Sequence, residues 1–196
     1  SAASDVYKRQ DLQRHMTMRK GKRSMSKGVL TVVSGFSGAG KGTVMRRLLE
    51  KYDDCVLSIS VTTRKPREGE VDGRDYFFRT KEEVEAMIEA DELLEYAQYV
   101  ENYYGTPRAY VEEMLSRGKN VILEIEIQGA MKIKEKISDT VLVFVTPPTI
   151  RELKNRLVGR GTETQAVIES RLRRAAEEAE GIESYDYLLV NDVVEN

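Results

Sequence analysis

Apolar, β-branched runs alternate with amphipathic stretches along most of this chain. A continuous apolar run bounded by turn residues is typical of a strand buried on both faces, whereas apolar residues three and four apart indicate a helix. The pattern predicts strands at residues 29–33, 56–60, 121–127, 141–145 and 187–190. It predicts helices at residues 43–52, 107–118, 130–136, 150–157 and 164–180. Because the two kinds of element alternate, we expect an α/β fold with a parallel sheet covered by helices.

One block, residues 58–106, interrupts this alternation with short strands and turns. Within it, Thr80 and Glu83 have the spacing of a capping box, which predicts a helix that reaches about Ala90. We therefore expect an inserted subdomain on the rim of the sheet. The expected short strands lie at residues 76–78 and 93–100, and the expected core comprises residues 27–57 and 107–196.

The first 24 residues differ from the rest of the chain. They are polar, lack an apolar period and contain seven Lys or Arg against two Asp or Glu. This composition predicts a disordered extension, not necessarily native, that precedes a folded domain at residues 25–196. Since the whole chain has a net charge of −2, the predicted domain carries −7 and is distinctly acidic.

Composition narrows the function classes. With 196 residues, of which 40% are hydrophobic, the chain is too apolar to be disordered, and it has no apolar run of about 20 residues that could span a membrane. The single cysteine, Cys55, excludes a disulfide framework and fits a reducing cytoplasm. The near-neutral charge argues against nucleic acid as a partner. The only histidine, His15, lies in the extension.

A glycine-rich loop joins the first predicted strand to the first predicted helix. Residues 34–43 read S-G-F-S-G-A-G-K-G-T, and backbone N–H groups in such a turn, with Lys41, bind nucleotide phosphates. The position that usually carries the magnesium-binding hydroxyl is Gly42, and Thr43 follows it. We therefore expect the metal to be held mainly by phosphate and water. The loop indicates a nucleoside triphosphate but not which reaction uses it.

Two further groups of residues can carry chemistry. Arg64 and Arg67 could together hold a second phosphate, although most such basic turns are simply solvated. Glu124 and Glu126, two apart on the strand predicted at 121–127, should share one face near its carboxyl end, where ligands bind in open α/β sheets. The alternation alone also fits a solvated strand face, which is the less favoured of the two interpretations.

Several motifs in register resemble the guanylate kinase family, from residue 29 to residue 192. They read S-G-F-S-G-A-G-K-G-T, S-V-T-T-R-K-P-R-E-G-E, E-Y-A-Q-Y, N-Y-Y-G-T, I-L-E-I-E-I-Q-G-A, R-L-V-G-R-G-T-E and V-N-D. The resemblance implies a phosphate-loop kinase fold with an inserted GMP-binding subdomain and a mobile lid at about 156–171. It also implies transfer of the γ-phosphoryl group of ATP to GMP or dGMP, with Mg²⁺ as cofactor.

The resemblance also implies the site residues. GMP-binding positions are Ser60, Arg64, Arg67, Tyr76, Glu95, Tyr104, Thr106 and Glu126. ATP-binding positions are Gly35, Phe36, Ser37, Gly38, Ala39, Gly40, Lys41, Gly42, Thr43 and Asn191. The catalytic positions are Lys41, Arg156, Arg160 and Arg171. Glu124 matches an acidic residue that acts near the metal through water, and many family members have Asp at positions 124 and 126.

Two alternatives remain at this point. One is an inactive guanylate-kinase-like module that binds phosphorylated partners, and the other is a kinase for a different small phosphorylated acceptor. Lys41 and the lid arginines argue against the first, and Glu95 with Thr106 argues against the second. Family members usually continue past V-N-D with a further helix, so this sequence is expected to lack it. A monomer and a homodimer are both compatible with the sequence.

Overall fold

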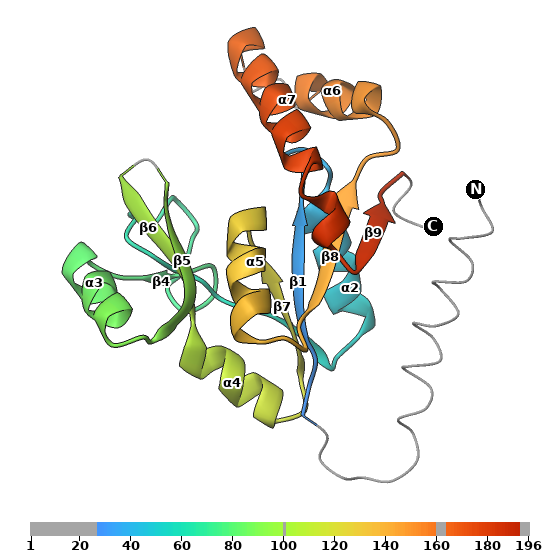
Figure 1. The fold of residues 1–196 in the computed structure, drawn as a ribbon. Coiled ribbons are helices and arrows are strands. Elements are labelled where there is room, and N and C mark those ends of the chain that lie inside the picture. Colours follow the sequence, from blue (N-terminus) through green and yellow to red (C-terminus); the bar gives the residue numbers. More distant parts are fainter. Residues whose placement is uncertain (1–26, 100, 160–163, 193–196) are drawn as a thin grey trace, which may run out of the picture.

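A computed structural model describes residues 27–99, 101–159 and 164–192, and these form two sheets. The larger sheet has five parallel strands in the order β2-β7-β1-β8-β9. Its strands are β1 (Leu30–Gly35), β2 (Cys55–Leu57), β7 (Asn120–Glu124), β8 (Val141–Thr146) and β9 (Tyr187–Val190). The expected α/β class with a parallel sheet is therefore confirmed (Figure 1).

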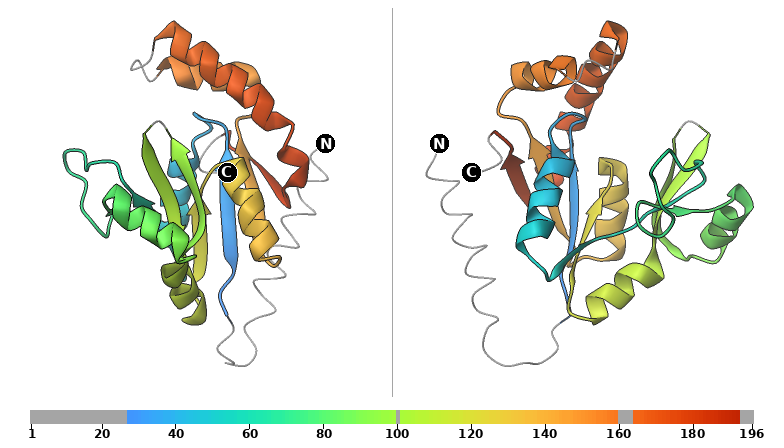
Figure 2. Two further views of the ribbon diagram at one scale, coloured as in Figure 1. Left: turned by 60° about the vertical axis from the view of Figure 1, so that its left-hand side comes forward. Right: turned by 180° about the vertical axis from the view of Figure 1, so that it is seen from behind.

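Successive residues of the central strands point to opposite faces of this sheet, as the period of two requires. Val33 and Val143 lie in a core with α2, α6 and α7, whereas Val32 and Leu142 lie in a core with α4 and α5. Figure 2 shows α2 and α5 on opposite faces of the sheet. The helices are α2 (Lys41–Lys51), α4 (Arg108–Ser116), α5 (Ile127–Lys136), α6 (Ile150–Gly159) and α7 (Gln165–Ala179), and a short 3-10 helix, η2 (Ile182–Ser184), follows α7.

The second sheet is built from the block that interrupts the alternation. Its order is β4-β3-β6-β5, and it is mixed, because β3 pairs parallel with β4 and antiparallel with β6. Its strands are β3 (Val61–Thr62), β4 (Phe77–Phe78), β5 (Leu93–Tyr99) and β6 (Asn102–Pro107). Figure 1 shows this sheet beside the central one, with α4 leading back from it to the core.

Helix α3 (Lys81–Glu89) covers the second sheet and begins as predicted. The Thr80 side chain accepts a hydrogen bond from the Glu83 backbone N–H, and the Glu83 carboxylate accepts one from the Thr80 N–H. Val84 of this helix is fully buried with Val61 and Leu93. The capping box therefore fixes the start of the helix that closes this small core.

The strand predicted at 121–127 is shorter than expected. Strand β7 ends at Glu124, and Glu126 is the N-cap residue of α5. The pairing ends there because β1 pairs with β7 only up to Val33 and then leads into the glycine-rich loop. The prediction that Glu124 and Glu126 share a strand face is therefore wrong. Strand β6 was not predicted, and it forms by pairing with β5.

No helix within the described ranges combines the length and the apolar character needed to cross a membrane.

Candidate functional site

The glycine-rich loop lies between the carboxyl end of β1 and the amino end of α2. Gly38 and Gly40 have φ angles of 95° and 88°, in the left-handed region that disfavours a side chain. A Cβ atom at Gly40 would also lie 2.4 Å from Nδ2 of Asn191. The backbone therefore curls tightly in front of the helix, where N–H groups and the positive end of the helix dipole favour a bound anion.

The ammonium group of Lys41 closes this loop. It donates hydrogen bonds to the carbonyl oxygens of Gly35 at 2.8 Å and of Phe36 at 3.3 Å. The first turn of α2 follows directly with Gly42 and Thr43. The structure therefore holds a cation across the loop.

Three elements distant in sequence converge on the same loop. From the end of β9, the buried side chain of Asn191 donates from Nδ2 to the carbonyl oxygen of Ala39 at 2.8 Å. From α6, Nη1 of Arg156 donates to the same oxygen at 3.4 Å, and Nε pairs with Glu152 at 2.8 Å. From α7, Arg171 donates to Oγ of Ser37. The structure thus brings two of the expected catalytic arginines together, whereas Arg160 lies outside the described residues.

A cavity of about 190 Å³ opens beside Lys41. Glu124, Glu126 and Glu178 line it together with Gly35 and Lys41. Although Glu126 is not on β7, it reaches this cavity because α5 starts directly behind the end of that strand. Acidic side chains therefore line the same small cavity as Lys41, next to where the loop would hold phosphates.

A second, larger cavity of about 410 Å³ extends along α2. It begins at Gly42 and Glu124 and continues past Met45 and Leu49 to Leu57. Glu124 lines both cavities.

Two residues of α7 belong to this region although the sequence analysis did not single them out. Arg174 pairs with Glu126 at 3.0 Å and with Glu178 at 3.1 Å. Burial raises the pKa of the Glu178 carboxyl. The signal was available, because Arg171, Arg174 and Glu178 are spaced three and four apart and so lie along one side of the helix.

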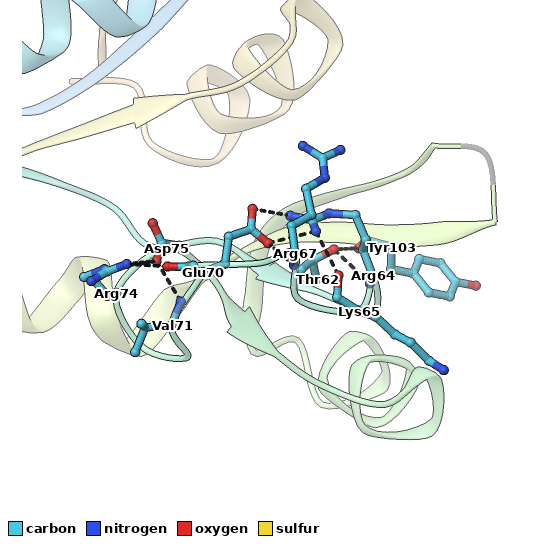
Figure 3. Close-up of polar contacts among 10 residues, drawn as sticks. Thr62, Arg64, Lys65, Arg67, Glu70, Val71, Arg74, Asp75 and Tyr103 are labelled. Atoms are coloured by element: carbon cyan, nitrogen blue, oxygen red, sulfur yellow. Dashed lines mark hydrogen bonds and ion pairs between the residues drawn. The ribbon is translucent and has the colours of Figure 1, made fainter.

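One carboxylate, that of Glu70, organises the basic turn that contains Arg64 and Arg67. Arg64 donates from both Nη atoms to Glu70 at 2.9 Å, and the Arg67 backbone N–H donates to it at 2.7 Å (Figure 3). These donors hold the pKa of Glu70 below its ordinary value. The guanidinium carbon of Arg64 also lies 5.3 Å from the centre of the Tyr76 ring. Arg64 is therefore held in place by an acid and an aromatic ring.

The other expected residues of this sheet lie close by. The rings of Tyr76 and Tyr104 have centres 6.2 Å apart and meet edge to face. Ser60 lies half-buried directly before β3. The structure therefore brings together one guanidinium group and two phenols, residue types that bind a phosphate, and the backbone of Arg67 is held by the same Glu70.

Glu95 and Thr106 form a buried polar pair on neighbouring strands. The Thr106 hydroxyl donates to Oε1 of Glu95 at 2.7 Å, and Glu95 is only 6% exposed. Burial raises the pKa of this carboxyl, and the nearby Glu126 adds to the effect, whereas Thr106, Lys132 and Lys136 oppose it. A carboxylate in such a place accepts from a ligand that offers two adjacent N–H donors, and a ligand without them would leave it unpaired.

The described residues contain no group of three His, Cys, Asp or Glu side chains that could hold a metal ion.

Comparison with known proteins is consistent with this geometry. Residues 27–196 match the family model described as guanylate kinase. A guanylate kinase of Oceanobacillus iheyensis is 55% identical over 170 residues, which are 87% of this chain and 82% of that protein. One of Enterococcus faecalis is 57% identical over 169 residues, which are 86% of this chain and 83% of that protein.

A solved structure gives the same result. The crystal structure of guanylate kinase from Anaplasma phagocytophilum superimposes with a TM-score of 0.67 at 37% identity, and the match covers 87% of this chain and 80% of that one.

Proposed function

This chain belongs to the guanylate kinase family, and from that premise we propose that it transfers the γ-phosphoryl group of ATP to GMP or dGMP, giving ADP and GDP or dGDP. The observation that carries the proposal is the buried pair of Glu95 and Thr106. Guanine offers N1–H and N2–H to such a carboxylate, and adenine has no matching pair of donors. The base is therefore selected by a site that only a guanine leaves fully paired.

The phosphate of the acceptor nucleotide is assigned to the basic turn. Arg64 and Arg67 supply guanidinium groups, and Tyr76 and Tyr104 supply hydroxyls, with Ser60 beside them. Glu126 is assigned to the base together with Glu95. Because Glu70 already holds the fork of Arg64, the guanidinium needs little reordering to meet a phosphate.

The triphosphate of ATP is assigned to the glycine-rich loop, residues 35–43. Backbone N–H groups and Lys41 face the β- and γ-phosphates, and Asn191 lies at the adenine side. Mg²⁺ fits this site as a metal held by phosphate and water, with Glu124 acting through water and Thr43 the nearest hydroxyl on α2. When bound, Mg²⁺ neutralises charge on the phosphate oxygens.

Catalysis then rests on alignment and on charge. The attacking phosphate oxygen of GMP is already anionic at neutral pH, so no strong base is needed. Lys41, Arg156 and Arg171, together with Arg160, neutralise the charge on the phosphoryl group that is transferred. We assign residues 156–171 to a lid and residues 58–106 to the GMP-binding subdomain. Closure of both would exclude water and limit hydrolysis of ATP. Since both substrates are cytoplasmic nucleotides, we place the enzyme in the cytoplasm.

An acceptor screen tests the proposal. With ATP and Mg²⁺, the protein should form ADP rapidly with GMP and dGMP and poorly with AMP, UMP or CMP. Equal turnover of all the monophosphates would refute guanine selection, and no turnover of any would favour a binding module without catalysis. Turnover of a different phosphorylated acceptor alone would identify another kinase.

A further inference from the structure

Gly129 lies in the first turn of α5, where nothing in the backbone requires a glycine. The glycines with positive φ are at other positions, so an alanine would fit this backbone. Glycine is also a weaker helix former than alanine. A reason for the glycine must therefore come from what surrounds it.

The space beside Gly129 is taken by the Glu95 carboxylate. A Cβ atom added at position 129 would lie 3.0 Å from Oε2 and 3.5 Å from Cδ of Glu95, and 3.2 Å from Cδ1 of Ile125. The first of these distances is shorter than ordinary van der Waals contact. The carboxylate therefore lies directly against the backbone of α5.

Glu95 has little freedom to move away. Only 6% of the residue is exposed, and its Oε1 accepts a hydrogen bond from the Thr106 hydroxyl at 2.7 Å. Neighbouring Leu94 is fully buried, which fixes the strand at this point. A side chain at position 129 would therefore displace the carboxylate by a few tenths of an ångström within a confined space.

We propose that Gly129 is a positioning residue for guanine recognition, because the missing side chain lets the Glu95 carboxylate lie against the first turn of α5 in the orientation that meets the base. The inference rests on the proposed function. The positive end of the α5 dipole also favours a carboxylate at this place. Gly129 thus acts on the acceptor base through Glu95 and does not touch either substrate itself.

Gly129→Ala is the direct test. Because a misplacement of about 1 Å costs about a hundredfold in enzyme activity, a shift of a few tenths should raise the KM for GMP about three- to tenfold. The KM for ATP and the kcat should stay within about twofold, because the loop and Lys41 are not touched. The melting temperature should fall by at most a few degrees, because the higher helix propensity of alanine offsets part of the crowding. Initial rates of ADP formation and thermal unfolding measure all four quantities.

The matched controls separate Glu95 from general packing. Gln128→Ala changes an exposed neighbour on the same turn and should leave the KM for GMP within about twofold of wild type. In a Glu95→Ala background, which removes the carboxylate, Gly129→Ala should add less than about twofold, because two changes that act through one contact are not additive. If the single variant folds poorly, adding Ile125→Val removes the contact at 3.2 Å and must keep the rise in KM.

Three results would overturn the inference. They are an unchanged KM for GMP in folded Gly129→Ala, a rise of the same size in the Glu95→Ala background, and an equal rise in the KM for ATP. If the wild-type protein turns over GMP and one of these three results is observed, only the proposed role of Gly129 is refuted. Wild-type protein that does not turn over GMP refutes the proposed function as well.

Discussion

Glu95 is a residue whose surroundings oppose its working state. Burial raises the pKa of its carboxyl, yet the proposed contact with guanine needs the ionised form. As the pH falls, Glu95 therefore takes up its proton at a higher pH than an ordinary glutamic acid, and binding of GMP weakens as it does so.

This gives a prediction for Glu95→Gln. At pH 7.5 the variant should raise the KM for GMP about tenfold or more, because hydrogen bonds to a charged acceptor are replaced by weaker ones. That ratio between variant and wild type should shrink as the pH is lowered from 7.5 toward 5, because wild-type Glu95 takes up its proton at a higher pH than an ordinary glutamic acid. Initial rates across this pH range measure it.

Taking the ratio of the KM values of the Glu95→Gln variant and the wild type also cancels the titration of the substrate. The GMP phosphate gains a proton near pH 6 in both assays, so it cancels from the ratio. A ratio that stays constant across the range would show that the ionisation of Glu95 does not control binding of GMP.

At this scale the sequence supplies identities better than contacts. Arg64 and Arg67 could be assigned to a phosphate from residue type and from the family resemblance. The ion pair between Glu70 and Arg64 depends on the fold of the turn, and no periodic pattern in the sequence predicts it. Arg174 and Glu178 had a helical spacing that pointed toward the site, but that spacing is equally usual on a solvated helix.

At the scale of elements, the glycine-rich loop, to which we assign the triphosphate of ATP, depends on its contact with β9. Asn191, 7% exposed, joins the end of β9 to the Ala39 carbonyl, and its backbone N–H bonds to Thr146 at the end of β8. The loop is thus supported by the sheet as well as by its own turn.

Asn191→Asp tests this support. An ionised aspartate has the same shape as asparagine but no N–H donor. The carboxylate at position 191 and the Ala39 carbonyl oxygen would then be two acceptors in contact with no hydrogen between them. We expect the free energy of unfolding to fall by about 1–3 kcal/mol and the KM for ATP to rise about tenfold. Denaturant unfolding and initial rates measure these, with Asp192→Ala, an exposed neighbour, as the control. An Asn191→Asp protein with wild-type KM for ATP would contradict a supporting role.

The elements themselves were predictable where local signals are strong. The strand at residues 187–190 and the helix capped by Thr80 match the structure. Helix α2 starts at Lys41, two residues before the predicted start, because the glycines on either side of Lys41 obscure the boundary. Strand β6 was missed because Gly105 and Pro107 are poor strand formers, and its pairing with β5 supplies what local propensity does not.

At the scale of the whole molecule, the second sheet contacts a helix of the central layer at Glu95, the residue that we assign to the acceptor base. Glu95 projects from β5 of the second sheet and lies against α5 of the first. The sequence predicted an α/β core with an inserted subdomain. It did not predict where the subdomain contacts the core, because that contact joins segments distant in sequence. A ligand bound at this junction contacts both sheets.

Binding of GMP should therefore stabilise the molecule as a whole. At about 100 times its dissociation constant, GMP should raise the free energy of unfolding by about 2.7 kcal/mol. The same concentration of AMP should have a much smaller effect, because it leaves Glu95 unpaired. Thermal unfolding with each nucleotide measures the difference. Equal stabilisation by both would mean that the phosphate alone carries binding.

The hydrogen bond between Asn191 and Ala39 joins residues 152 positions apart. During synthesis on the ribosome, the glycine-rich loop emerges long before β9 does. A growing chain can thus fold its first strands and helices while the loop lacks this partner. The support of the loop therefore waits for β9 to dock, and the loop gains this contact only after residue 191 has been made.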